Sequence, residues 1–246
     1  MPVSRLLPSA GIHLWASGDE SAADSHPRGH LVYAARGVLS LHTEHGTSIV
    51  PADRIAWTPA GCTHRHRAHG ETDMRIVFLP PSLARLVPDR PAVFRASGLA
   101  REALLTLASA RTFDRAGRDR LRRVLVDELQ EAHEQPLHLP EPRDDRLRAV
   151  ARVLYDNPAD TSTLTGLGRR SGASARTLSR LFHHELGMTF YEWRTQLRIY
   201  HALVLLANGH DVTRVAHACG WANPSGFIAA FTAIVGTTPG RHRLAR

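Results

Sequence analysis

Basic side chains gather on one face of a helix that the sequence predicts between residues 175 and 186. An α-helix turns 100° per residue, so Arg176, Arg180, His183 and His184 fall on one side of the segment SGASARTLSRLFHHELG. The opposite side is apolar and comprises Leu178, Leu181, Phe182 and Leu186. A guanidinium fork can grip phosphate or the edge of guanine with two hydrogen bonds. The face can therefore bind a polyanion, although a solvated amphipathic helix shows the same pattern.

The two ends of this helix are marked by the residue types that cap helices. Ser174 stands at the N-cap, and Gly187 stands where a left-handed C-terminal residue is expected. We therefore predict a helix from Ala175 to Leu186.

Composition restricts the class of protein. The chain has 246 residues, of which 43% are hydrophobic and 22% charged, which is typical of one large or two small globular domains and excludes a disordered chain. It has no apolar run of membrane-spanning length and lacks the long apolar segment of a secretory signal, so we expect a cytoplasmic protein with no membrane partner.

Cys62 and Cys219 lie far apart, which argues against a disulfide framework or a thiolate zinc site. We expect both to be reduced.

The net charge of +8 lies almost entirely in the last two-fifths of the chain. Residues 1–142 contain 17 basic and 16 acidic residues, whereas residues 143–246 contain 14 basic and 7 acidic residues. All 31 basic residues are arginine, which we attribute to a GC-rich genome rather than to recognition. The second part is therefore the candidate polyanion-binding part.

The first half of the chain has the pattern of short strands. Runs rich in Val, Ile, Leu and aromatic residues, such as IHLWAS, HLVYAA and RIAWTP, alternate with turn residues and predict an antiparallel barrel or sandwich. From about Gly98 the apolar period becomes helical, and Gly117 to Glu134 form an amphipathic helix. Its stripe of Leu121, Leu125 and Leu129 must cover the flank of the barrel or a second subunit, and we take it as a candidate dimer surface.

The second half predicts a series of short helices. DRLRAVARVLYDNP ends at Asn157 and Pro158, and further helices are expected at about 163–171, 189–207, 212–219 and 224–235. The sequence also partly repeats after 48 residues, so that Gly172 matches Gly220, and after one more residue Phe182 matches Phe231. Each glycine would occupy the tight turn of a helix-turn-helix unit, where a positive φ is needed.

The segments LGRRSGASARTLSRLFHHELGMTFYEWRTQLRI and VTRVAHACGWANPSGFIAAFTAIVGTTPGRHR resemble the DNA-binding domain of AraC/XylS-type transcription regulators. The resemblance implies that the helices after Ser174 and Asn223 enter successive major-groove segments of double-stranded DNA. Arg176, Thr177 and Arg180 would then reach base edges, with a salt bridge inside the domain as the alternative for Arg180. The other implied DNA contacts are His183 and His184 to phosphate, Asn223 and Ser225 to phosphate or as caps, and Ala229 or Thr232 to a thymine methyl.

The sequence departs from the family pattern at two places, and the first changes which unit we expect to read the DNA sequence. The second recognition helix, SGFIAAFTAIVG, has no arginine, so we expect the first unit to supply most of the specificity and the second to anchor. Phe190 replaces the proline that usually follows G-M-[ST], whereas Pro239 keeps it in the second copy. Cys219 follows the family habit and is expected to be a buried packing residue.

The segments DSHPRGHLVYAARGVLSLHTEHG and IVPADRIAWTPAGCTHRHRAHG resemble cupin-like effector and dimerisation domains. In metal-binding cupins the matching segments hold one ion, which here would use His26, His30 and His64 with Asp24 as a fourth ligand, for zinc, nickel, iron or copper. The alternative is a pocket whose histidines bind an organic ligand or face water. We expect His66 and His69 to be exposed in the same loop as His64.

The fold class that follows is α+β with two domains. A cupin-like β-barrel with flanking helices is expected at 1–97, a helical dimerisation segment at 98–135, a proline-rich linker at 136–143, and an all-α double helix-turn-helix domain at 144–246. The predicted function is a sequence-specific, homodimeric transcription regulator that binds a small effector or a metal ion and is not an enzyme. RNA polymerase is a further candidate partner. The alternative is a metal-dependent cupin enzyme, of dioxygenase or isomerase type, fused to a DNA-binding domain.

Overall fold

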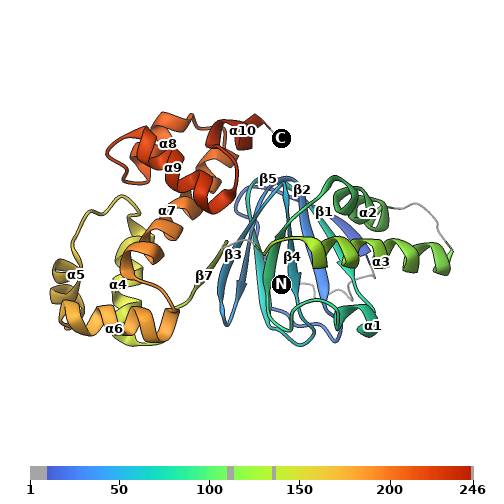
Figure 1. Cartoon of the computed structure of the whole chain (residues 1–246), viewed down its shortest axis with the longest axis horizontal. Helices are drawn as coiled ribbons and strands as arrows, with labels where there is room; N and C mark the ends of the chain where they lie inside the picture. Colours follow the sequence, from blue (N-terminus) through green and yellow to red (C-terminus); the bar gives the residue numbers. More distant parts are fainter. Residues whose placement is uncertain (1–9, 110–113, 135–136, 245–246) are drawn as a thin grey trace. The chain divides into compact units, whose positions relative to one another are not determined.

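A computed structural model of the chain describes residues 10–109, 114–134 and 137–244. The described chain divides into two compact units, one before Leu139 and one from Leu139 to Leu244. The first contains an antiparallel sheet with helices, and the second is helical (Figure 1). No helix among the described residues is long and apolar enough to cross a membrane.

Two long strands dominate the sheet of the first unit. β2 (His30–Thr43) and β5 (His64–Phe78) pair antiparallel along nearly their whole length. The other strands are β1 (Ala10–Trp15) beside β5, β3 (Gly46–Pro51) beside the end of β2, β4 (Arg54–Thr58) beside the start of β2, β6 (Ala92–Arg95) beside β4, and β7 (His138–Pro140) at the boundary of the two units. Among the described residues no pairing returns from β3 to β1, so the predicted cupin-like barrel is a curved sheet that is not closed.

An irregularity in the middle of β2 has a local cause. The pairing with β5 shifts register between Ala34 and Val38, and Gly37 there has a φ of +83°. A Cβ on Gly37 would lie 2.5 Å from the carbonyl oxygen of Glu71, so only glycine allows the two backbones to approach this closely.

Helices cover one face of this sheet. They are α1 (Pro81–Ala84), α2 (Gly98–Ala108) and α3 (Arg115–Glu131), and Figure 1 shows α2 and α3 beside each other. Leu125 and Leu129, which are 0% and 2% exposed, lie in a core with Leu31 and Trp57 of the sheet, and Leu121 packs against that core. This corrects the predicted dimer surface, because the leucine stripe covers the sheet of its own chain and leaves almost no surface for a second copy.

The second unit follows the predicted series of helices closely. Its helices are α4 (Asp145–Asp156), α5 (Leu164–Ser171), α6 (Ala175–Leu186), α7 (Phe190–Ala207), α8 (Val212–Ala218), α9 (Pro224–Val235) and α10 (Pro239–Leu244). Gly172 and Gly220 both have positive φ, at +70° and +82°, in the turns that precede α6 and α9. The internal repeat is confirmed, since α5–α6 and α8–α9 are two helix-turn-helix units joined by α7.

The repeat also places equivalent side chains in the core. Leu178, Phe182 and Leu186 of α6 are at most 6% exposed, and so are Phe227, Phe231 and Val235 of α9. Cys219 is buried, and burial raises the pKa of its thiol to about 12, which confirms the prediction of a packing residue. Both cysteines are free thiols.

Candidate functional site

Helix α6 presents the basic face that its sequence predicts. The Ser174 hydroxyl accepts a hydrogen bond from the Thr177 amide at 3.0 Å, and Gly187 ends the helix at a φ of +69°. With Phe182 and its apolar neighbours fixed in the core, the side chains of Arg176 and Arg180 are exposed. The helix is therefore held by packing on one side while its guanidinium groups face outward.

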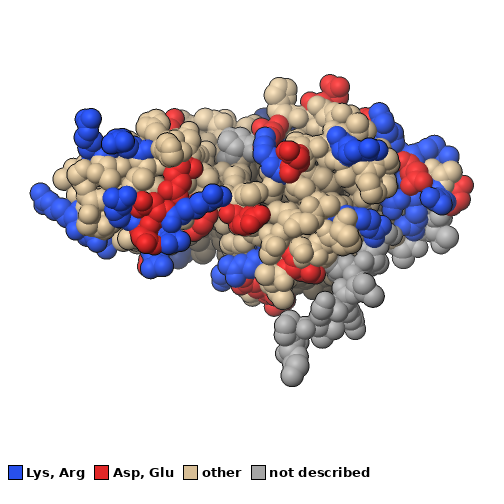
Figure 2. Space-filling view, turned by 90° about the horizontal axis from the view of Figure 1, so that it is seen from below, with Lys and Arg blue, Asp and Glu red and all other residues tan. Residues whose placement is uncertain are grey.

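The charges on this face are not neutralised by the protein. Neither Arg176 nor Arg180 forms an ion pair or a side-chain hydrogen bond with another described residue, so the alternative of an internal salt bridge for Arg180 has no support. His183 and His184 are exposed one turn later, and Thr177 is half-buried. Seen from below, arginines are spread over the surface of the helical unit, with acidic side chains between them (Figure 2).

A surface hollow of about 670 Å³ runs along α6 and includes a residue that sequence reasoning missed. Arg180, His183 and His184 line it together with Arg146, which comes from α4. Only the fold brings α4 beside α6, so no local sequence pattern marks Arg146. It adds a second helix to the basic face, although its guanidinium, unlike those of Arg176 and Arg180, is paired with the Asp144 carboxylate.

Two carboxylates hold Arg146 in place. Asp144 accepts hydrogen bonds from Nε and Nη2 of Arg146 at 3.0 and 2.8 Å, and these bonds lower the pKa of Asp144 to about 2. Glu185 of α6 accepts hydrogen bonds from the backbone amides of Arg143 and Asp144. The start of α4 is thereby tied to α6, which fixes the position of Arg146 along the hollow.

The second recognition helix, α9, offers a different surface. Asn223 caps it by accepting a hydrogen bond from the Gly226 amide at 2.8 Å. Ser225 and Ala229 are exposed, whereas the Thr232 hydroxyl donates to the Ile228 carbonyl at 2.7 Å and leaves mainly its methyl group for other contacts. Ile228 is 38% exposed, so this helix presents small and apolar groups where α6 presents arginines.

Arg198, in the helix that joins the two helix-turn-helix repeats, contacts both of them, and the sequence did not predict these contacts. Arg198 of α7 donates from Nε to the Pro158 carbonyl and from Nη2 to the Asp160 carbonyl, both at 2.9 Å. Its guanidinium also lies 5.6 Å from the ring centre of Trp221, in the turn before α9. Arg198 thus joins the loop before α5 to the turn before α9.

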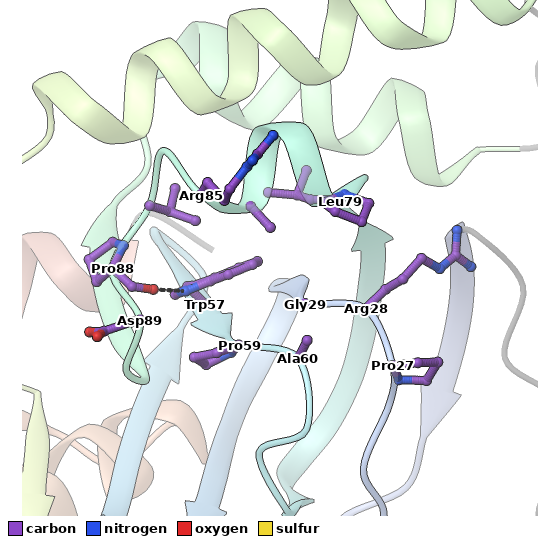
Figure 3. Close-up of a pocket in the computed structure, with 13 residues that line it drawn as sticks. Pro27, Arg28, Gly29, Trp57, Pro59, Ala60, Leu79, Arg85, Pro88 and Asp89 are labelled. Atoms are coloured by element: carbon purple, nitrogen blue, oxygen red, sulfur yellow. Dashed lines mark hydrogen bonds between the residues drawn. The ribbon is translucent and has the colours of Figure 1, made fainter.

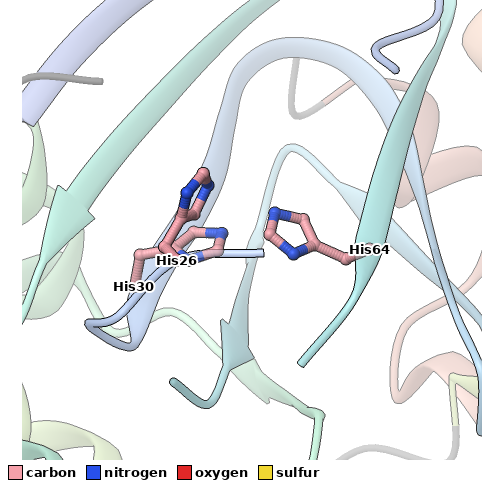
Figure 4. Close-up of side chains that lie close together, drawn as sticks. All are labelled: His26, His30 and His64. Atoms are coloured by element: carbon pink, nitrogen blue, oxygen red, sulfur yellow. The ribbon is translucent and has the colours of Figure 1, made fainter. Parts of the chain in front are cut away.

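In the first unit, three histidines meet at the ends of two strands. His26 precedes β2, His30 begins β2 and His64 begins β5, and one ligand nitrogen from each lies within 4.8 Å of the other two (Figure 4). Ideal tetrahedral zinc–imidazole bonds would place these nitrogens about 3.4 Å apart, so the rings must close slightly around an ion. The donor set suits a borderline transition metal better than calcium or magnesium.

His26, His30 and His64 form what we call the imidazole cluster, and the protonation of His30 and His64 favours metal binding. Nδ1 of His64 lies 3.0 Å from the Cys62 carbonyl oxygen, which can only accept, so Nδ1 carries the proton and Nε2 keeps its lone pair. Burial lowers the pKa of His30 well below its ordinary value, with smaller effects from the neighbouring imidazoles. Both ring nitrogens of His30 are buried without a hydrogen-bond partner, an arrangement that a bound ion would relieve.

Asp24 lies beside this cluster rather than within it. Its backbone forms two hydrogen bonds with the backbone of His64, both at 2.9 Å. Its carboxylate is half-exposed and lies 3.7 Å from Nδ1 of His26. Asp24 is therefore placed to orient His26, as carboxylates often orient metal-binding imidazoles, and it is not among the three grouped ligands.

The prediction that His66 is exposed is wrong. The segment HRHRAH belongs to strand β5, not to a loop, and its side chains alternate, so His64 and His66 point inward while Arg65 and Arg67 are exposed. His66 is 5% exposed, and its ring centre lies 5.1 Å from that of His64. His69 is half-buried, with Nε2 3.0 Å from the Ser40 hydroxyl. The period-two alternation in the sequence was the signal that could have predicted this.

Comparisons with known proteins match both units. A family model described as a helix-turn-helix domain matches residues 167–245, and one described as a cupin domain matches residues 11–80. The HTH-type transcriptional regulator NimR of Escherichia coli K12 is 32% identical over 233 residues, which is 94% of this chain and 85% of that protein. The HTH-type transcriptional regulator RipA of Corynebacterium glutamicum is 43% identical over 101 residues, which is 41% of this chain and 30% of that protein.

A solved structure of ToxT from Vibrio cholerae covers 96% of this chain and 97% of that chain, with 10% identity and a TM-score of 0.42. The match to NimR spans nearly the whole of both proteins, and the helix-turn-helix and cupin models fall on the two units that the structure separates. The chain therefore belongs to the AraC/XylS-type transcription regulators that carry an N-terminal cupin-like domain.

Proposed function

We propose that this regulator recognises a specific DNA sequence mainly through α6. The observation that carries the proposal is the pair of exposed, unpaired arginines on a helix whose other face is fixed in the core. A helix-turn-helix places the N-terminal residues of its second helix against base edges in the major groove. Arg176, Thr177 and Arg180 lie there and are assigned to bases, while Ser174, His183 and His184 are assigned to the adjacent backbone.

Helix α9 serves mainly as an anchor in this proposal. Asn223 and Ser225 stand at its start, where amide and hydroxyl groups meet phosphate, and Ala229 and the Thr232 methyl can contact thymine methyl groups. Without a charged side chain on its exposed face, α9 can discriminate A·T from G·C at few positions. We assign Arg146 to a phosphate contact beside α6.

We further propose that the cupin-like unit binds a transition metal ion, with His26, His30 and His64 as the ligands. Three imidazoles whose ligand nitrogens lie within 4.8 Å of one another support this assignment, and a small organic effector in the same interior is the alternative. A bound ion would hold the segment before β2 against the start of β5. A ligand can regulate DNA binding only if it binds two states of the protein with different affinity.

We propose a regulator rather than an enzyme. The named relatives are transcriptional regulators, which supports this choice. A metal-dependent cupin enzyme fused to a DNA-binding domain is the second candidate, since the imidazole cluster could in principle support turnover. We also propose a cytoplasmic homodimer that acts with RNA polymerase, formed through a surface other than the leucine stripe of α3.

The test is selection of bound duplexes from a random DNA pool by the full-length protein at physiological salt. We expect enrichment of one sequence with a guanine-containing half that α6 reads, and affinity for that sequence at least about 10³-fold above that for random DNA. Failure to enrich any sequence, with or without zinc, would contradict the proposal. Mass spectrometric metal analysis of the same sample separates the regulator with a metal effector from one that binds an organic molecule.

A further inference from the structure

Helix α9 presents hydrocarbon where the equivalent helix α6 presents guanidinium groups. Both helices are 12 residues long, and α6 begins at Ala175 whereas α9 begins at Pro224, an offset of 49 residues. Arg180 of α6 therefore corresponds to Ala229 of α9. Ile228, which precedes it, is one of two large apolar side chains that are exposed in the described part of the second unit. Covering an exposed isoleucine is favourable, so this position suits an apolar contact.

The hydrogen-bonding groups of α9 lie at its start or are already used. Asn223 caps the helix through its side-chain oxygen, and the Ser225 hydroxyl is exposed in the first turn. The Thr232 hydroxyl donates to the Ile228 carbonyl at 2.7 Å, which turns its methyl group toward the outer face. Beyond the first turn, the outward-facing groups are hydrocarbon and belong to Ile228, Ala229, Thr232 and Ala233. No residue of α9 is charged.

The major groove offers one apolar group, which is the C5-methyl group of a pyrimidine. Thymine carries this methyl group, cytosine and uracil lack it, and 5-methylcytosine carries it at the same position of the ring. Guanine is usually recognised by arginine or lysine, and the cytosine amino group by a carboxylate, and α9 has neither kind of side chain. A helix whose outer face is hydrocarbon therefore distinguishes base pairs mainly by this methyl group.

We propose that α9 recognises the C5-methyl groups of pyrimidines, with Ile228 as the residue that determines this specificity. The inference rests on the proposed function, in which α9 contacts DNA in the major groove. It goes further, because thymine and 5-methylcytosine should be accepted alike although their partner purines differ. Methylation of a cytosine at C5 within the α9 half-site would therefore strengthen binding of this regulator.

Trp221 reports whether α9 contacts the duplex. It is half-buried in the turn before α9, and its ring centre lies 5.2 Å from that of Phe227. Of the other three tryptophans, Trp57 is buried in the first unit, where its indole nitrogen donates to the Pro88 carbonyl at 2.7 Å (Figure 3). The remaining two lie in β1 and α7. A change in emission on DNA binding that Trp221→Phe removes is therefore specific to the start of α9.

The affinity of the full-length protein for its selected duplex and for substituted duplexes tests the proposal. Deoxyuridine replaces thymine, one position at a time, in the half-site about 10 base pairs from the guanine that α6 contacts. At each contacted position we expect binding to weaken by roughly fourfold, the effect of removing one buried methyl group. A C·G pair at that position should also bind more weakly, and a 5-methylcytosine·G pair should restore the affinity to within about twofold of T·A.

Variants at Ile228 assign the effect to this side chain. Ile228→Ala should bring the ratio of thymine to uracil affinity close to one at the position that Ile228 covers. Ile228→Val keeps a branched apolar side chain and should preserve the ratio. Arg180→Ala is the matched control in the other recognition helix, since it should weaken binding to both duplexes equally and leave the ratio unchanged.

Three results would each overturn the inference. They are tolerance of uracil at every position of the α9 half-site, binding of 5-methylcytosine no better than that of cytosine, and an unchanged thymine to uracil ratio in Ile228→Ala. A Trp221 signal that persists in these cases would show that α9 binds DNA by other contacts, which leaves the proposed function intact. Failure to select any sequence would overturn the proposed function and this inference with it.

Discussion

Gly172 and Gly220 occupy equivalent turns of the two helix-turn-helix units, but only Gly220 is enclosed. Both adopt left-handed backbone conformations, with φ values of +70° and +82°. A Cβ on Gly172 would meet nothing within 4 Å, whereas a Cβ on Gly220 would lie 2.8 Å from both Ala159 Cα and Arg198 Nη2. The two copies of the repeat therefore share the backbone conformation of this glycine, but not the residues packed around it.

Because of this difference, replacing glycine by alanine should destabilise the protein by unequal amounts at the two positions. Gly172→Ala should lower the free energy of unfolding by about 1–2 kcal/mol, the cost of a left-handed conformation for a residue with a Cβ. Gly220→Ala should lower the free energy of unfolding further. Its methyl group would also collide with the backbone of Ala159 and displace the Arg198 guanidinium, which contacts both helix-turn-helix repeats. Urea unfolding followed by helical circular dichroism measures both, and equal losses would contradict the role given to Arg198.

Arg180 should carry sequence discrimination. Arg180→Ala is expected to weaken binding to the selected DNA sequence by roughly 1–3 kcal/mol, or about 5- to 150-fold, and to weaken binding to random duplex far less. Fluorescence anisotropy at fixed salt gives both affinities. Arg152→Ala, which removes an exposed arginine of α4 outside the α6 hollow, should leave their ratio unchanged. Equal losses on both DNAs would remove Arg180 from the base-reading role.

Arg146 should behave as a phosphate contact. Its removal in Arg146→Ala is expected to weaken binding to selected and random DNA by the same factor, because phosphate is present in every sequence. The slope of log affinity against log salt concentration should become shallower by about 0.9, the value for one lost phosphate contact. Arg148→Ala, on the same helix but outside the hollow, is the matched control, and an unchanged slope in Arg146→Ala would exclude this contact.

The sequence predicted the features that depend on near neighbours. The caps Ser174 and Gly187, the helix bounds of the second unit and the paired glycines are set by local preferences and by the repeat, and the structure has them where expected. The features that it did not predict depend on packing between distant segments. Arg146 joins the face of α6 through the fold, and the leucine stripe of α3 packs on the chain's own sheet.

His64 should be essential for metal binding. Cobalt(II) added to metal-free protein is expected to give the visible absorption of a tetrahedral nitrogen-rich site, which His64→Ala should abolish. Asp24→Asn should weaken binding by roughly tenfold or more, as expected of a residue that orients a ligand. His69→Ala is the control, since His69 lies on the same strand outside the cluster, and unchanged absorption in His64→Ala would contradict the site.

His66 should make the stability of the metal-free protein depend on pH. Burial, followed by the neighbouring imidazoles, lowers its pKa from 6.5 to about 3 in the folded chain. The unfolded chain therefore takes up the proton first as the pH falls, so this stability is complete above the ordinary histidine pKa and is lost between about pH 6.5 and 3. At pH 5.5 the loss from this one group should be roughly 1 kcal/mol relative to pH 7.5, and the lowered pKa of His30 acts in the same direction. Urea unfolding of EDTA-treated protein measures it. His66→Leu should flatten the dependence and His45→Gln, which removes an exposed imidazole, should not; an equally steep dependence in His66→Leu would show that the acid sensitivity arises elsewhere.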